Sequence, residues 1–83
     1  MEDKRIALIG IIVDEGGEVN ELNALLHDAR DYIIGRMGIP YREKGVSIIS
    51  IAMDAPQNVI SALSGKLGML DGISAKVIYS KKG

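Results

Sequence analysis

Two adjacent glycines, Gly16 and Gly17, separate an apolar segment from a helix-like pattern, and loops of this kind often hold a small ligand. The first backbone amides of a helix have no acceptor within it, so they can donate to a bound group. Asn20, on the polar side of the expected helix, would add an amide side chain. A plain turn explains the glycines equally well, with Gly17 as the helix cap and Gly16 at an unusual backbone angle. Both interpretations stay open at this point.

A nucleotide-binding loop is not indicated by these glycines. A G-x-G-x-x-G fingerprint would need glycines at positions 16, 18 and 21, and glutamates hold the latter two. No phosphate-loop lysine follows, and Glu15, Glu18 and Glu21 would repel phosphate. The acidic residues of the first turn complement the positive end of the helix dipole, which explains them without an acid–base pair or a cation site.

A second candidate lies in the glycine-rich residues 35–42, which contain Arg36 and Arg42. Either guanidinium could offer a planar fork to a carboxylate. Both are equally typical of solvated surface charges. This segment need not lie far from the paired glycines of a neighbouring subunit. The candidate ligand-binding residues are therefore Gly16, Gly17, Asn20, Arg36 and Arg42.

Catalysis and metal binding gain no support from the residue types. The chain has no cysteine, which excludes zinc ribbons, iron–sulfur ligation and a cysteine nucleophile. The one histidine, His27, lies on the polar face of the expected helix, where a solvated side chain is the ordinary outcome. Its i, i+4 pairing with Asp31 would make only a weak metal site. We predict no catalytic residue, no bound metal and no cofactor.

Composition argues against nucleic acids and membranes as partners. The 10 basic and 11 acidic residues are intermixed, unlike the basic surface of a phosphate-backbone binder. RNA-binding sheets stack bases on aromatic side chains, and this chain has no Phe or Trp. The apolar run at residues 6–13 is too short to span a bilayer, and the residues after Met1 do not resemble a secretion signal. We expect a cytoplasmic protein.

Apolar periodicity predicts the elements that would position these residues. The β-branched runs at residues 6–13 and 46–53 are apolar on both parities, as expected for strands covered on both faces. A three- and four-residue spacing that begins at Val19 and continues to Ile33 predicts a long first helix starting at Glu18.

Gly35 and Gly38 bracket the predicted exit from this helix. Pro40 confines a short strand at residues 39–42 to the edge of a sheet, because proline has no amide to donate. A hairpin turn is expected at residues 43–45.

A second helix is predicted to start at residues 54–57. Asp54 can cap it, Pro56 suits its first turn, and Gln57 completes a capping box. Gly68 would end this helix. A final strand is expected at residues 73–79.

The resulting order, βαββαβ, predicts an α+β fold of the ferredoxin-like class. Two right-handed crossovers interleave to give a four-stranded antiparallel sheet with two helices on one face. The 83 residues suffice for one such domain, spanning 1–83. The strands at 6–13 and 46–53 would then be central, and the strand with Pro40 would be an edge.

Two helices cover only one face of this sheet, yet both parities of its central strands are apolar. An apolar face in water is rarely tolerated by a monomer, and a chain of 83 residues without cysteine has no disulfide to compensate for a small core. We therefore expect a homo-oligomer, a dimer or a tetramer, with sheets packed face to face or joined at their edges. A partner protein on this face would explain the pattern too.

A family resemblance is carried by four segments: GRMGIPYREKG at residues 35–45, VSIISI at 46–51, LSGKLG at 63–68 and GISAK at 72–76. They resemble the small stand-alone bacterial proteins known as iron-only hydrogenase system regulators. The βαββαβ order with a glycine turn after the first strand is also similar to ACT-like regulatory domains. Such domains bind amino acids or other small molecules at subunit interfaces through that loop, where Gly17 would match the family glycine and Gly16 replaces a frequent proline.

The resemblance implies a non-catalytic regulatory module of an iron-only hydrogenase system. It would sense a small molecule at a subunit interface or act through a protein partner. A structural or assembly protein that acts only through its oligomer interfaces is the alternative. Every segment is used by the predicted fold, so we expect no direct contact with nucleic acid.

Overall fold

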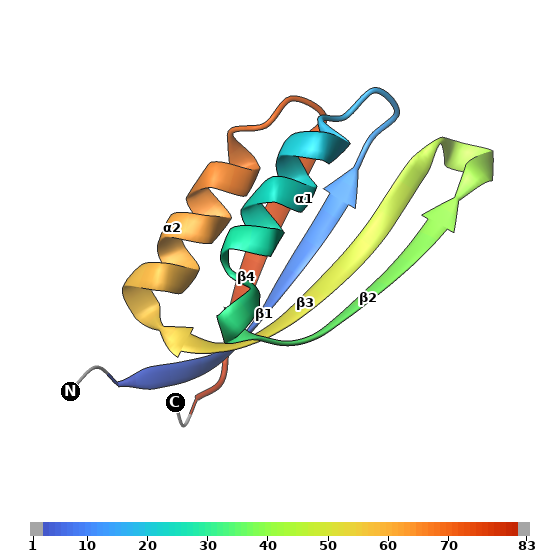
Figure 1. The fold of residues 1–83 in the computed structure, drawn as a ribbon. Helices are drawn as coiled ribbons and strands as arrows, with labels where there is room; N and C mark the ends of the chain where they lie inside the picture. Colours follow the sequence, from blue (N-terminus) through green and yellow to red (C-terminus); the bar gives the residue numbers. More distant parts are fainter. Residues whose placement is uncertain (1–2, 82–83) are drawn as a thin grey trace.

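A computed structural model describes residues 3–81 and shows a four-stranded sheet with two helices on one face (Figure 1). The strands and helices are β1 (Lys4–Val13), α1 (Val19–Asp28), β2 (Ile33–Tyr41), β3 (Val46–Pro56), α2 (Gln57–Gly68) and β4 (Ile73–Tyr79). Single 3-10 turns, η1 (Arg30–Tyr32) and η2 (Arg42–Lys44), flank β2. The strand order is β2-β3-β1-β4 with every pair antiparallel, which confirms the predicted ferredoxin-like α+β fold.

The two most apolar segments form the centre of the sheet, as predicted. β1 pairs with β3 from Lys4–Pro56 to Val13–Ser47, and with β4 on its other side. Alternate side chains of these strands point at the helices and are buried there. The core-facing residues of the central strands are Ala7, Ile9, Ile11, Val13, Ile49, Ile51, Met53 and Ala55. They pack against buried leucines and an isoleucine of α1 and α2.

The first helix is shorter than its apolar spacing predicts. α1 ends at Asp28, and the chain passes through η1 into β2, so the predicted helical position of Ile33 is wrong. Tyr32 and Ile33 are still partly buried against the core. The apolar spacing therefore continues across the helix end although the backbone has left the helix.

β2 is longer than predicted and begins before the glycines. It spans Ile33–Tyr41, so Gly35 and Gly38 lie within the strand instead of at a helix exit, and Arg42 belongs to η2. A register shift opposite β3 marks a bulge at the start of the strand. β2 is the sheet edge next to β3, which is where Pro40 was expected.

β3 also extends beyond its predicted end. Asp54 pairs with Ile6 in the sheet and does not cap α2; Pro56 takes the cap position, with no side-chain cap bond. The strand continues because β1 starts at Lys4 and offers it a partner. The end of α2 at Gly68 and the bounds of β4 agree with the prediction.

The face of the sheet that the helices leave uncovered is apolar, as the strand pattern predicts; we call it the open face. Its large apolar side chains are between 42% and 67% exposed. They are Ile6, Leu8, Ile12, Met37, Ile39, Tyr41, Ile48 and Ile78. Among residues 3–81 no helix is long and apolar enough to cross a membrane.

The core depends on α2, whose Leu67 is fully buried. Leu67→Ala should lower the free energy of unfolding by about 2–5 kcal/mol, because it removes buried methyl groups and leaves a cavity. Met69→Ala removes a side chain that is 84% exposed, only two positions away, and should change stability by less than about 0.5 kcal/mol. Urea unfolding followed by circular dichroism measures both values, and similar losses in the two variants would contradict this packing.

Candidate functional site

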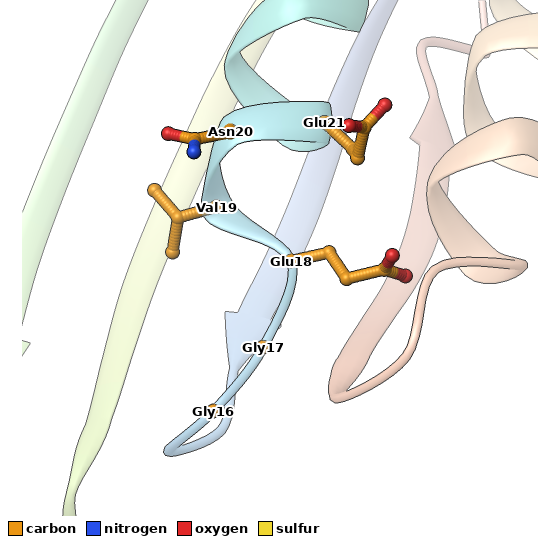
Figure 2. A pocket seen from close by; sticks show the side chains of 6 residues that line it. All are labelled: Gly16, Gly17, Glu18, Val19, Asn20 and Glu21. Atoms are coloured by element: carbon orange, nitrogen blue, oxygen red, sulfur yellow. The ribbon is translucent and has the colours of Figure 1, made fainter.

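Gly16 and Gly17 form the loop between β1 and α1 (Figure 2). Gly16 has a φ of +84°, a region that favours glycine, so the expected unusual backbone angle is confirmed. Gly17 is required for a different reason. A Cβ at this position would lie 2.9 Å from Val13 Cγ1 and 3.0 Å from the carbonyl oxygen of Gly72. Only glycine fits there without displacing a neighbouring loop.

That neighbouring loop joins α2 to β4. It is hydrogen-bonded to the glycine loop, and each loop supplies both donors and acceptors. The amide of Asp14 donates to the Gly72 carbonyl at 2.7 Å, and the amide of Glu18 donates to the Asp71 carbonyl at 3.2 Å. In return the Asp71 amide donates to Glu18 Oε2 at 2.7 Å. Glu18, not Gly17, therefore occupies the cap position of α1, and the predicted cap is wrong because this cross-loop contact fixes the helix start. Nothing in the sequence pattern predicted this contact between the two loops.

Most amides of the glycine loop already have acceptors. The Gly17 amide donates to the Asp14 carbonyl at 2.9 Å, and the Val19 amide donates to the Gly17 carbonyl at 2.9 Å. The loop lines an open depression of about 380 Å³ with residues 16–21. In Figure 2 the side chains of Val19 and Asn20 point to one side of α1, and those of Glu18 and Glu21 to the other. These contacts explain the glycines as a structural turn, and a ligand role for them stays a prediction.

The candidate arginines lie apart from one another. Arg36 pairs with Ile51 in the sheet, so its side chain is on the helix side, where Nη2 donates to Asn23 Oδ1 of α1 at 3.2 Å. Arg42 lies in η2 at the tip of the β2–β3 hairpin. Within one chain the structure thus brings Gly16, Gly17 and Asn20 into one depression, without Arg36 or Arg42.

The hairpin tip nevertheless approaches the glycine loop of the same chain. A Cβ on Gly45, which follows η2, would lie 3.1 Å from Glu15 Oε2. Arg42 and the glycine loop therefore share one end of the sheet.

A second depression, of about 390 Å³, lies between α1 and β2, and no pattern in the sequence predicted it. It is lined by Asn23, Leu26, His27, Arg30, Ile33 and Arg36. His27 is exposed, as expected, but Asp31 lies in η1 after α1 has ended, so the two do not have the helical i, i+4 relation. Among residues 3–81 no group of three or more His, Cys, Asp or Glu side chains is placed to hold a metal ion.

The fold is that of a ferredoxin-like α+β domain. Residues 5–77 match the family model described as "TM1266-like: Iron-only hydrogenase system regulator, putative". The chain belongs to this family. The solved structure of uncharacterized protein TM1266 from Thermotoga maritima is 34% identical, with a TM-score of 0.91, and the match covers 95% of this chain and 100% of that one.

More distant structures share the fold alone. A formyltetrahydrofolate deformylase from Pseudomonas putida KT2440 has a TM-score of 0.64 at 13% identity, over 94% of this chain and 29% of that chain. Protein SO0527 from Shewanella oneidensis has a TM-score of 0.55 at 8% identity, over 94% and 92% of the two chains. No curated protein matches the sequence.

The tight contact at Gly17 predicts a stability effect that needs no ligand. Gly17→Ala should destabilise the fold by about 1–3 kcal/mol, because the added methyl group meets the Gly72 carbonyl and Val13. Gly65→Ala places the same methyl group in open space inside α2 and should stabilise the protein by about 0.5–1 kcal/mol. Chemical unfolding measures whether each substitution lowers or raises the free energy of unfolding. A Gly17→Ala protein as stable as the wild type would refute the contact.

Proposed function

We propose that this protein is a non-catalytic regulator in an iron-only hydrogenase system and works as a homo-oligomer assembled through its open face. Family membership supports the regulatory role. The observation that carries the mode of action is the apolar open face itself. Soluble monomers rarely expose a contiguous apolar surface that spans all the strands of a sheet.

The surface shape of the open face, with long and small side chains next to one another, favours a second copy of the chain as its binding partner. Across the middle of the sheet Met37, Ser50 and Gly10 lie side by side, so one long side chain stands beside two small residues. Leu8 and Ala52 lie in the adjacent row and line two shallow depressions on this face. A two-fold interface requires projections and hollows on one surface, and this face offers both.

Ionisable groups are sparse on this surface. Lys76 lies beside Gly10 in the middle row, Asp54 lies beside Ile6, and Lys4 is on the same side of β1 at its far end. Most of the rest of this surface can therefore be buried without removing a charge from water, a step that costs several kcal/mol per ion. Burial of the apolar side chains then supplies the driving force for association.

An effector would act on this assembly at the end of the sheet that carries the glycine loop. Asn20 and Arg42 provide polar side chains at that end, and the glycine loop would lie beside a neighbouring subunit. We also propose that the assembled form acts through a protein partner that recognises it.

Assembly through the open face predicts that one charge placed there separates the subunits. Leu8→Lys should weaken self-association by at least about 100-fold, because the ammonium group would be buried without a partner. Its circular dichroism spectrum should stay that of the wild type, since Leu8 is 42% exposed in the single chain. Light scattering at micromolar concentration should give one chain mass for this variant and a multiple for the wild type.

Ala24→Lys adds the same charge on the exposed side of α1 and should leave the mass of the wild type unchanged. A wild-type protein with the mass of one chain, or a Leu8→Lys protein that keeps the oligomeric mass, would overturn the interface.

Regulation through the assembled form predicts an effect in cells that contain the iron-only hydrogenase system. A strain whose own copy carries Leu8→Lys should change its hydrogenase activity as strongly as a strain that lacks the gene, while Ala24→Lys should behave as wild type. Hydrogen evolution per cell measures this. If deletion leaves hydrogen evolution unchanged although Leu8→Lys still dissociates the oligomer, the chain is a structural protein that acts only through its interfaces.

A further inference from the structure

The depression between α1 and β2, here called the basic depression, concentrates positive charge on the helix side of the sheet. Its polar lining consists of Asn23, His27, Arg30 and Arg36, and its apolar lining of Leu26 and Ile33. The polar residues come from three successive elements, α1, η1 and β2. Among the residues that the structure describes, no acidic one lines it.

Both guanidinium groups are anchored by one hydrogen bond and keep other donors available. Arg30 Nη1 donates to the His27 carbonyl at 2.9 Å, and Arg36 Nη2 donates to Asn23 Oδ1 at 3.2 Å. A guanidinium has five N–H donors, so most of those on each arginine are left for another acceptor. Within residues 3–81 neither side chain has a carboxylate oxygen within 4.0 Å.

Arg30 also changes the electrostatics of the end of α1. The last carbonyl groups of a helix carry partial negative charge, which would repel an anion nearby. Arg30 donates to one of these carbonyls, that of His27, and places its own positive charge beside them. Asp28 and Asp31 are exposed and do not line the depression. The charged side chains that line the depression are therefore both positive, which favours an anion.

We propose that the basic depression binds a small organic anion. Its carboxylate or phosphate group would pair with Arg30 and Arg36, whose planar forks suit both groups. Its carbon skeleton would lie against Leu26 and Ile33, which are the apolar part of the lining. This depression shares no lining residue with the glycine loop. The inference therefore goes beyond the proposed function and assigns a second ligand site, whether or not the glycine loop binds an effector.

The probes are succinate, glycerol phosphate and inorganic phosphate, each at 10 mM and constant ionic strength, with the neutral diamide of succinate as a blank. For a dissociation constant of about 1 mM, linkage should raise the melting temperature by about 5–10 °C in a domain of this size. We expect this rise with succinate or glycerol phosphate in the wild type, and its loss in Arg30→Gln and Arg36→Gln. The two organic probes tell a carboxylate ligand from a phosphate ligand.

Lys66→Gln removes the same charge from α2 and should keep the full rise, which controls for net charge. In nuclear magnetic resonance spectra of the wild type, the organic anion should shift the Asn23 side-chain amide and the His27 ring, whatever the stability of the variants. No rise with either organic anion, a rise that survives in Arg36→Gln, or unmoved Asn23 and His27 signals would overturn the site. Inorganic phosphate acting as strongly as the organic anions would overturn the ligand class. The oligomer mass of the ligand-free protein is measured independently of these outcomes, so the proposed assembly is tested separately.

Discussion

The central strands β1 and β3 are apolar on both faces, while the chain supplies two helices that lie on the same side of the sheet (Figure 1). One face becomes a core with Ile9, Ile51 and Met53 at no measurable exposure. The other keeps its isoleucine and leucine side chains about half exposed. A polar open face would have served a monomer equally well, because antiparallel sheets commonly have one solvated face. The apolar pattern on both parities is thus the main constraint on how this protein works.

The helix side depends on a second constraint, the contact between the loops before α1 and after α2. Gly17 and Gly72 approach so closely that neither position has room for a Cβ, and Gly72 also needs a positive φ of +73°. Glu18 bonds to both backbone groups of Asp71 and so joins the start of α1 to the loop before β4. This arrangement positions α1 over the sheet and gives the paired glycines a structural explanation.

Periodicity was enough to predict the element order, the central strands and the edge position of Pro40, because these follow from apolar alternation and from a missing amide. The end of α1 could not be predicted, since Ile33 stays near the core after the chain has left the helix. Gly35 and Gly38 misled the prediction because an exposed edge strand tolerates glycine. The basic depression was not predicted because the strand was expected to start only at residue 39. It forms only when β2 begins early enough to bring Arg36 beside Asn23.

The two proposed surfaces meet in β2. Alternate residues of a strand face opposite sides, so Arg36 lies in the basic depression while Met37 and Ile39 lie on the open face. β2 is an edge strand with no residue below intermediate exposure, and a bulge separates its first residue from the rest. Such a weakly packed edge can shift at small free-energy cost compared with β1 or β3. An anion that fixes Arg36 would therefore favour one position of Met37 and Ile39, and the affinity of one sheet for another would depend on the ligand. By linkage the assembled form would then bind the same anion with an affinity different from that of the single chain.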